Sequence, residues 1–185
     1  MSKLKYKVGD LIEAAKTGEV DVIAQQNNCY CTRKSGIAPL IDKAFPKFAK
    51  VEDSTKKFTK EKLGRISYAI YSTSPVVTFD CNGTRTEVDE IDLIIFGLYG
   101  QLGWWGRKKG QRDTDYKALS SAFSYMEKRL GFYRDKDTCK IGLPLLGCGL
   151  AGGDWKVVSQ IVEEELCSKG WDVTVYVLDE KDIPS

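Results

Sequence analysis

Short apolar runs alternate along the chain with amphipathic stretches, and this alternation indicates an α/β fold. Five of the apolar runs predict strands, at residues 21–27, 65–80, 91–100, 139–146 and 172–178. The first of them, DVIAQQN, is typical of a buried strand. Asn82-Gly83 stands between the second and third runs and is a strong signal for a β-hairpin turn.

Amphipathic helices are predicted where apolar residues recur every three or four positions, over residues 37–45, 113–131 and 155–170. Pro46 is expected to end the first helix. The second helix has Asp113 or Thr114 as its N-cap and Gly131 in the C-cap position. The stretch 45–64 carries many charges and predicts a further helix with a solvated face.

A chain of 185 residues is expected to form one domain, over residues 1–185, with a substantial core. Its net charge of +2 gives no overall attraction to nucleic acid. The opening MSKLKYKVGD lacks the apolar core of a signal peptide, and no apolar run reaches the roughly 20 residues that span a bilayer. We therefore expect a cytoplasmic protein with no membrane partner.

The chain contains six cysteines and no histidine. Reduced thiols are expected, and the spacing of Cys29 and Cys31 is unlike that of zinc ligands, so neither a metal nor a cofactor is predicted. The lack of an imidazole excludes Ser-His-Asp, Cys-His and two-histidine phosphatase mechanisms. Cys148 lies near a helix N-terminus, which favours a thiolate, but packing is the preferred role because no histidine can assist it.

Two strand-to-helix loops share one design. VIAQQNNCYCTRKSG leads to a helix near Gly36, and LPLLGCGLAGGD leads to a helix near Trp155. Each loop places flexible backbone with N–H groups beside the positive end of a helix, where an anion is favoured. Two such loops at one sheet edge predict a diphosphate site, and the absence of Gly-Lys-Ser/Thr excludes a P-loop. Tight packing is the simpler explanation of either loop alone.

The order of seven segments resembles the macrodomain family over residues 4–180: VGDLIEAA, DVIAQQNN, SGIAPLIDKAFP, GLYGQ, TDYKAL, IGLPLLGCGLAGGDW and VTVYVLDE. The resemblance is closest to a bacteriophage branch that processes ADP-ribose 1″-phosphate and is related to the ADP-ribosyl-glutamate hydrolases. It implies a single three-layer α/β/α macrodomain with a central mixed sheet. It also implies that ADP-ribose binds in a cleft at the carboxyl ends of the strands. For a viral chain, the expected compartment is the host cytoplasm.

At the adenine end of the ligand, the resemblance implies contacts by Asp10 and Leu11, and closure by Leu178 and Asp179. Other roles stay open for these residues. Asp10 is followed three positions later by Glu13, which is the pattern of a helix N-cap. Leu178 follows the last predicted strand and would also suit the core.

The resemblance assigns two loops to the diphosphate and the distal ribose. Their residues are Ser35, Gly36, Ile37 and Ala38 in the first loop, and Gly147, Cys148, Gly149 and Leu150 in the second. This role explains the glycines, because a Cβ atom would keep backbone amides away from phosphate oxygens. Asn28, with Asn27 beside it, matches a residue that meets the distal ribose. A carboxamide suits ribose hydroxyls, although an Asn pair also turns a chain.

The chain departs from the glutamate-deacylating relatives at both of their catalytic positions. Gly100 and Gln101 stand where those relatives carry a lysine nucleophile, and Ala151 stands where they carry an aspartate. Deacylation through a lysine adduct is therefore not expected. Asp154 and Asn28 are the remaining catalytic candidates, and Asp154 would either orient a water molecule or only cap the last helix.

The stretch QLGWWGRKKGQRD, residues 101–113, places Trp104 and Trp105 among basic side chains, namely Arg107, Lys108, Lys109 and Arg112. Three roles stay open: a lid over a ligand, packing of the tryptophans into the core, and contact with nucleic acid by stacking and phosphate contacts. The basic cluster is short, and strong non-specific affinity needs several phosphate contacts.

The leading function is recognition and processing of ADP-ribose derivatives, and dephosphorylation of ADP-ribose 1″-phosphate is the first reaction to consider. Two other functions stay open. A non-catalytic reader would only bind or sequester ADP-ribose, and a hydrolase would remove ADP-ribose from a protein or a nucleic acid. The expected partners are accordingly ADP-ribose, ADP-ribose 1″-phosphate or an ADP-ribosylated macromolecule.

Overall fold

The computed structural model describes residues 3–79 and 85–184. Their backbone forms one six-stranded sheet with the order β1-β6-β5-β2-β4-β3. The strands are β1 (Lys5–Val8), β2 (Val22–Asn28), β3 (Ile66–Phe79), β4 (Arg85–Gln101), β5 (Lys140–Leu143) and β6 (Asp172–Val177). Neighbouring strands run parallel except β3, which is antiparallel to β4. The sheet is therefore mixed, as predicted.

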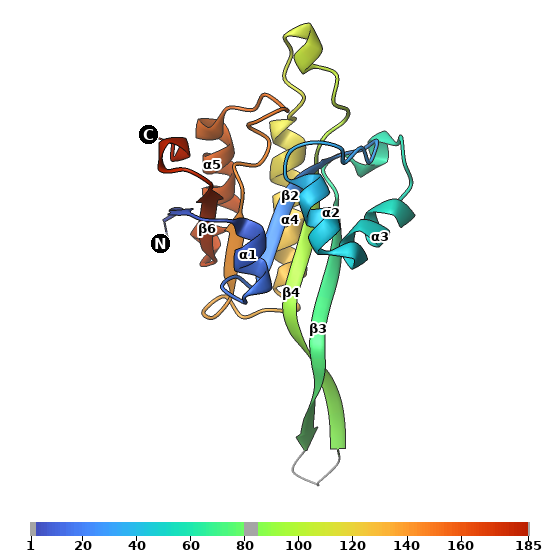
Figure 1. Cartoon of the computed structure of the whole chain (residues 1–185), viewed down its shortest axis with the longest axis vertical. Coiled ribbons are helices and arrows are strands. Elements are labelled where there is room, and N and C mark those ends of the chain that lie inside the picture. The colour runs from blue at the N-terminus through green and yellow to red at the C-terminus, as the bar shows by residue number, and fades with distance from the viewer. Residues whose placement is uncertain (1–2, 80–84, 185) are drawn as a thin grey trace.

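Helices cover both faces of the sheet (Figure 1). They are α1 (Leu11–Lys16), α2 (Ala38–Ala44), α3 (Pro46–Ser54), α4 (Tyr116–Leu130) and α5 (Trp155–Glu165). Four 3₁₀ turns join the described elements: η1 (Lys60–Lys62), η2 (Arg107–Lys109), η3 (Cys167–Lys169) and η4 (Glu180–Asp182). Because α1, α2 and α3 pack on one face and α4 and α5 on the other, the three-layer α/β/α prediction is confirmed. Within the described ranges, no helix combines the length and apolar character needed to cross a membrane.

The alternation of side chains along each strand divides the core into two halves. In β2, Val22 and Ala24 pack with α4 and α5, while Ile23 packs with α1, α2 and α3. Phe123 of α4 and Phe48 of α3 are fully buried in the two respective halves. The sheet therefore has two apolar faces, which explains why β2 begins as a continuous apolar run.

Helix α4 begins later than a cap at Asp113 or Thr114 would place it. The N-cap is Asp115, whose carboxylate accepts a hydrogen bond from the backbone N–H of Ala118. The N–H groups of Asp113 and Thr114 donate instead to the carbonyl oxygen of Ala151, at 2.9 and 3.2 Å. These two residues are bound to the glycine-rich loop, so the helix starts only after them.

The stretch 45–64 is only partly the solvated helix that was predicted. Pro46 ends α2, as expected, and it is also the first residue of α3, where its missing N–H costs nothing. Helix α3 has the predicted solvated face, and on its other face Phe48 and Glu52 are both fully buried.

The strands differ from the predicted runs at several ends. β1 was not predicted, because its four residues are mostly exposed and lack an apolar pattern. β5 ends at Leu143, before Pro144, and is shorter than the run 139–146. The β3–β4 hairpin is longer than expected and projects from the body of the molecule (Figure 1). The predicted turn at Asn82-Gly83 lies outside the described residues.

Five strands end at one edge of the sheet, because β1, β6, β5, β2 and β4 all run in the same direction. The loops that follow them gather at this edge, opposite the projecting hairpin (Figure 1). These carboxyl-edge loops are residues 9–10, 29–37, 102–115, 144–154 and 178–179. All the predicted ligand loops belong to this set, so the topology brings them to one side of the molecule.

A buried and an exposed phenylalanine near the same helix should respond differently to the same substitution. Phe123→Ala should lower the free energy of unfolding by about 3–5 kcal/mol, because it opens a cavity in the core. Phe132→Ala should change it by less than about 0.5 kcal/mol, because this ring is 79% exposed. Urea unfolding of both variants checks the assignment, and equal losses would contradict the described core.

Candidate functional site

The fold itself requires three of the four glycines in the loop 144–154, and Gly152 is one of them because its φ is +69°. Gly147 has φ +76°, and a Cβ atom there would lie 2.6 Å from Oε1 of Gln26. Its carbonyl oxygen accepts hydrogen bonds from Thr114 Oγ1 at 2.7 Å and from the N–H of Gly153 at 2.8 Å. A Cβ atom at Gly153 would lie 2.5 Å from that same oxygen. Tight packing therefore accounts for Gly147 and Gly153.

Gly149 is different, because neither its backbone nor its neighbours require a glycine. Its φ lies outside the left-handed region, and a Cβ atom there would meet nothing within 4 Å. The next residue, Leu150, is half exposed. Within the described part of the chain, no acceptor pairs with the N–H groups of these two residues. The loop thus presents two backbone donors to the space beyond the sheet edge.

A buried polar network supports this loop from below. Nε2 of Gln26 donates to Oε1 of Gln101 at 2.6 Å and to Oγ1 of Thr114 at 3.1 Å. Nε2 of Gln101 donates in turn to the carbonyl oxygen of Gly103 at 2.6 Å. Gln101 is therefore occupied in joining β2 to the loop after β4.

The loop after β2 is held by Asn28 and Arg33. The carboxamide of Asn28 donates to the carbonyl oxygen of Thr32 at 2.7 Å and accepts from its N–H at 3.1 Å. Arg33 pairs with Asp42 at 2.7 Å and with Asp53 at 3.1 Å, which ties the loop to α2 and α3. Burial acts to lower the pKa of Arg33, but its two carboxylate partners outweigh burial and raise it. Sequence reasoning missed Arg33, because its partners lie far along the chain.

The first predicted ligand loop follows directly from this anchored segment. Ser35 and Gly36 are exposed, and Gly36 has φ +66°, which explains the glycine without a ligand. Ile37 is the N-cap of α2, and Ala38 is its first residue. The structure thus places these four residues at the carboxyl edge, where the resemblance requires them.

The predicted adenine end is assembled from the loops after β1 and β6, which are neighbours in the sheet. Asp10 is the N-cap of α1, and its Oδ1 accepts from the N–H of Ile12 at 2.7 Å. The side chain of Leu11 is buried against Gly142. Leu178 is 79% exposed, so its alternative role in the core is wrong.

Asn27 does not join the carboxyl-edge loops, because it lies on the opposite face of β2 from Asn28. A Cβ atom added to Gly97 would lie 2.3 Å from Nδ2 of Asn27 and 2.9 Å from Oε1 of Glu52. Asn27 is 4% exposed, and no described residue forms a hydrogen bond with its carboxamide. The structure therefore groups it with a buried cluster under α3 rather than with the predicted ribose contacts.

The cluster under α3 is built around the carboxyl group of Glu52. It accepts hydrogen bonds from Ser67 Oγ and, at 3.0 Å, from the hydroxyl of Tyr99. Thr55 Oγ1 lies 3.4 Å from the same hydroxyl. Burial raises the pKa of Glu52, and the hydrogen bonds from Ser67 and Tyr99 offset only part of that rise. An isolated glutamate in a charged stretch gave no sequence signal for this role.

The raised pKa of Glu52 predicts a specific pH dependence of stability. The unfolded chain releases this proton near pH 4.5, while the folded protein retains it to higher pH. The folded state then binds more protons, so the free energy of unfolding must fall as pH rises above 4.5 toward the folded pKa. Glu52→Gln removes this contribution, so its stability relative to the unmodified protein should increase from acidic to neutral pH.

Urea unfolding at acidic and at neutral pH measures this difference in stability between Glu52→Gln and the unmodified protein. Glu61→Gln is the matched control, because Glu61 is exposed and should behave like the unmodified protein. An identical pH profile for Glu52→Gln and the unmodified protein would show that Glu52 titrates normally in the fold.

The two side chains considered for chemistry at the second loop have structural partners. Asp154 is the N-cap of α5, and its Oδ1 accepts from the N–H of Lys156 at 2.9 Å. Its carboxylate is nevertheless exposed at the carboxyl edge, so the second oxygen can reach water. Burial, and then the charge of Asp154, raise the pKa of Cys148 to about 12. The packing role predicted for Cys148 is therefore favoured over a nucleophilic one.

Four aromatic residues form an exposed cluster beside these loops, and we call it the aromatic surface: Tyr30, Phe58, Trp104 and Trp105. Tyr30 packs edge-on against Phe58 and against Trp105, with ring centroids 5.0 Å apart in both pairs. Trp104 and Trp105 are 49% and 36% exposed, and Phe58 is 70% exposed. The tryptophans are therefore not core residues, and a surface role is left for them.

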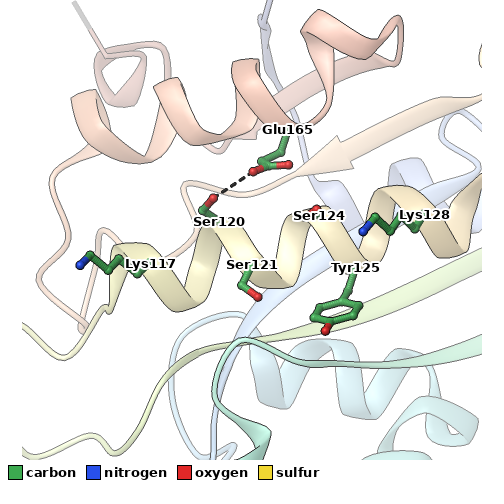
Figure 2. Close-up of a pocket in the computed structure, with 7 residues that line it drawn as sticks. All are labelled: Lys117, Ser120, Ser121, Ser124, Tyr125, Lys128 and Glu165. Carbon is green, nitrogen blue, oxygen red and sulfur yellow. Dashed lines mark hydrogen bonds between the residues drawn. The ribbon is translucent and has the colours of Figure 1, made fainter.

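Two hollows in the surface lie outside the predicted ligand loops. One is a groove of about 470 Å³ along α4. Its lining residues are drawn in Figure 2: Lys117, Ser120, Ser121, Ser124, Tyr125 and Lys128, with Glu165 of α5 at its border. The second, of about 500 Å³, lies beside Thr114 at the end of β4. Neither is lined by the residues assigned to ADP-ribose, so that assignment rests on loop geometry.

Comparisons with known proteins agree with this architecture. No family model matches the chain. Uncharacterized protein 032R of Invertebrate iridescent virus 6 is 42% identical over 40 residues, which are 22% of this chain and 40% of the viral protein. The macrodomain of Thermus aquaticus DarG has a TM-score of 0.64 and 21% identity, covering 96% of this chain and 99% of that one.

A structure of Thermosipho africanus DarTG in complex with ADP-ribose has a TM-score of 0.67 and 18% identity. The match covers all of this chain and 44% of that one, so the chain spans less than half of the DarTG protein. At such identities the likeness establishes the fold and not the activity. The three-layer mixed sheet described here has the macrodomain fold.

Proposed function

We propose that this protein binds ADP-ribose at the carboxyl edge of its sheet and processes ADP-ribose derivatives. The observation that carries the proposal is Gly149, a glycine that the fold does not require. Its N–H group and that of Leu150 have no acceptor among the described residues. A phosphate oxygen that approaches those donors would need the space that a Cβ atom would fill. The macrodomain fold, shared with a protein solved in complex with ADP-ribose, supports the same ligand.

The carboxyl-edge loops fit the parts of this ligand in a definite order. Asp10 and the exposed Leu178 lie after neighbouring strands and would hold the adenine, with the backbone of Leu11 beside them. The loops 35–38 and 147–150 would hold the diphosphate. Asn28, which closes the loop after β2, would act on the distal ribose chiefly by positioning that loop.

Calorimetric titration tests the ligand and the role of Gly149 together. ADP-ribose should bind with a micromolar dissociation constant and more tightly than ADP or NAD, because the distal ribose adds contacts. Gly149→Ala should weaken binding about tenfold, or about 1.4 kcal/mol, with unchanged stability. Gly131→Ala is the control, since a Cβ atom there meets only ordinary contacts at 3.7 Å, at the C-terminal end of α4. Absence of any heat with ADP-ribose would refute the proposed ligand.

Dephosphorylation of ADP-ribose 1″-phosphate is the reaction we propose first. No histidine is available, so the attacking water would be oriented by a carboxylate, and Asp154 is exposed at the end of the second loop. One of its oxygens caps α5, which fixes the side chain in place. The other oxygen would accept a hydrogen bond from the water that attacks the terminal phosphate.

Two substitutions separate catalysis by Asp154 from its capping role. Asp154→Asn keeps a good N-cap and should abolish phosphate release while leaving stability and ADP-ribose binding intact. Asp154→Ala should lose turnover and also about 1 kcal/mol of stability. Full turnover by Asp154→Asn would exclude the carboxylate mechanism. An absence of turnover in the unmodified protein, with tight binding, would instead identify a non-catalytic reader.

Removal of ADP-ribose from a nucleic acid is a second candidate function, favoured by the aromatic surface. Its exposed rings offer stacking faces for bases. Exposed lysines flank it on two segments, and Nζ of Lys108 lies 6.0 Å from the ring of Trp104. The surface adjoins the loop after β2, so a strand stacked there would lie beside the proposed distal ribose site.

The double variant Phe58→Ala/Trp104→Ala tests this second function. It should lower activity on an ADP-ribosylated single-stranded oligonucleotide at least tenfold, because each stacked base contributes about 1–3 kcal/mol. Its affinity for free ADP-ribose should be unchanged. Phe132→Ala, an equally exposed aromatic ring at the other end of α4, serves as the control. If the double variant is as active as the control variant, the aromatic surface does not bind the nucleic acid.

A further inference from the structure

Cys31 and Lys62 form a close pair that the proposed function does not use. Nζ of Lys62 lies 2.9 Å from Sγ of Cys31 and donates to it. The same ammonium donates to Oγ1 of Thr55 at 2.6 Å and lies 4.1 Å from the centre of the Tyr99 ring. The contacts with Thr55, at the end of α3, and with Tyr99 hold the amine of Lys62 next to the sulfur.

The backbone presents Cys31 to this lysine in an unusual conformation. Cys31 has φ +56°, a left-handed conformation that costs a residue other than glycine free energy. The N–H of Cys31 bonds to the carbonyl oxygen of Asn28, and the carboxamide of Asn28 closes the turn through Thr32. Several contacts of the turn therefore fix the position of the sulfur, and Cys31 as a residue is only half-buried.

The other four described thiols are built differently. Burial raises the pKa of Cys29 and Cys167 to about 11, and that of Cys139 and Cys148 to about 12. Such thiols stay protonated and react slowly. Cys31 differs in its contacts, because the Lys62 nitrogen lies 2.9 Å from its sulfur, and a neighbouring cation assists the reaction of a thiol with electrophiles.

We propose that Cys31 and Lys62 form a peroxide-responsive pair, in which oxidation of the thiol is followed by a covalent bond between sulfur and lysine nitrogen. In the first step the Cys31 thiolate attacks a peroxide. The O–O bond breaks, an S–O bond forms, and the leaving hydroxide takes a proton to become water. Sulfur loses two electrons to the peroxide, and the product is a sulfenic acid.

The second step follows from the conversion of the Cys31 sulfur to a sulfenic acid. Burial acts to lower the pKa of Lys62, but its hydrogen bonds to Cys31 and Tyr99 outweigh burial and raise that pKa in the reduced protein. A neutral sulfenic acid removes the contribution of Cys31, so the pKa of Lys62 falls and more of the amine is in its neutral form. Its nitrogen attacks the adjacent sulfur, the S–O bond breaks, and water leaves with an amine proton, giving an S–N bond.

Peptide mapping by mass spectrometry after brief treatment with hydrogen peroxide tests this sequence of events. In the unmodified protein, the peptides of Cys31 and Lys62 should become linked, with a mass lower by two hydrogen atoms than their sum. A thiol reductant should reverse the link. The other four described thiols should stay unmodified at the same exposure, and Cys81, outside the described residues, is read on its own peptide.

Variants of the lysine separate the two steps. Lys62→Arg keeps a cation but cannot form the link, so Cys31 should still oxidise quickly and its sulfenic acid should accumulate as a dimedone adduct. Lys62→Met removes the cation and should slow oxidation severalfold. Lys60→Met, an exposed lysine in the same 3₁₀ turn, should behave like the unmodified protein.

Two results would overturn the proposal. One is that Cys31 oxidises no faster than the other four described thiols, and the other is that its sulfenic acid persists in the unmodified protein. Because the measurement reads mass and not ligand binding, its outcome is independent of the proposed ADP-ribose site.

Discussion

The hydrogen bond from Thr114 Oγ1 to the carbonyl oxygen of Gly147 joins the loops on which the candidate site depends. Gln26 donates to Thr114 from below, and Gly153 donates to the same carbonyl from the side. These hydrogen bonds join β2 and the loop after β4 to the loop 144–154, although Oε1 of Gln26 is buried without a partner among the described residues. The loop 144–154 is thereby rigid at its base, and only its tip at Gly149 is left to meet a ligand.

A second constraint comes from the period of a strand. The side chain of Gln26 points toward α4, whereas that of Asn27 points toward α3, because successive side chains alternate between faces. The carboxyl end of β2 therefore contributes side chains to two separate polar clusters. One of them organises the carboxyl-edge loops, and the other surrounds the buried carboxyl group of Glu52.

The sequence predicts the fold more completely than the site. Helical periodicity and apolar runs located α2, α4, α5 and the central strands, but β1 has too few buried residues to show a pattern. Because successive side chains in a strand point to opposite faces, the sequence alone predicts that neighbouring residues such as Asn27 and Asn28 do not share one site. Arg33 and Glu52 were beyond reach, because their partners are brought together only by the packing of α3. The glycines were located from sequence, but only the geometry distinguishes Gly149 from the others.

The order of the strands also governs how the chain can fold as it is made. Among the described strands, β1 pairs only with β6. The backbone of residues 5–8 therefore forms its sheet hydrogen bonds only after residues 172–177 have been synthesised. The hairpin of β3 and β4 has no such delay, since its strands are consecutive. Synthesis therefore favours growth of the sheet from the β4 side, with both ends of the described chain joining last, side by side. An early arrest of translation would leave β1 as an exposed, unpaired strand, whose lysines at positions 5 and 7 then discourage pairing with other chains.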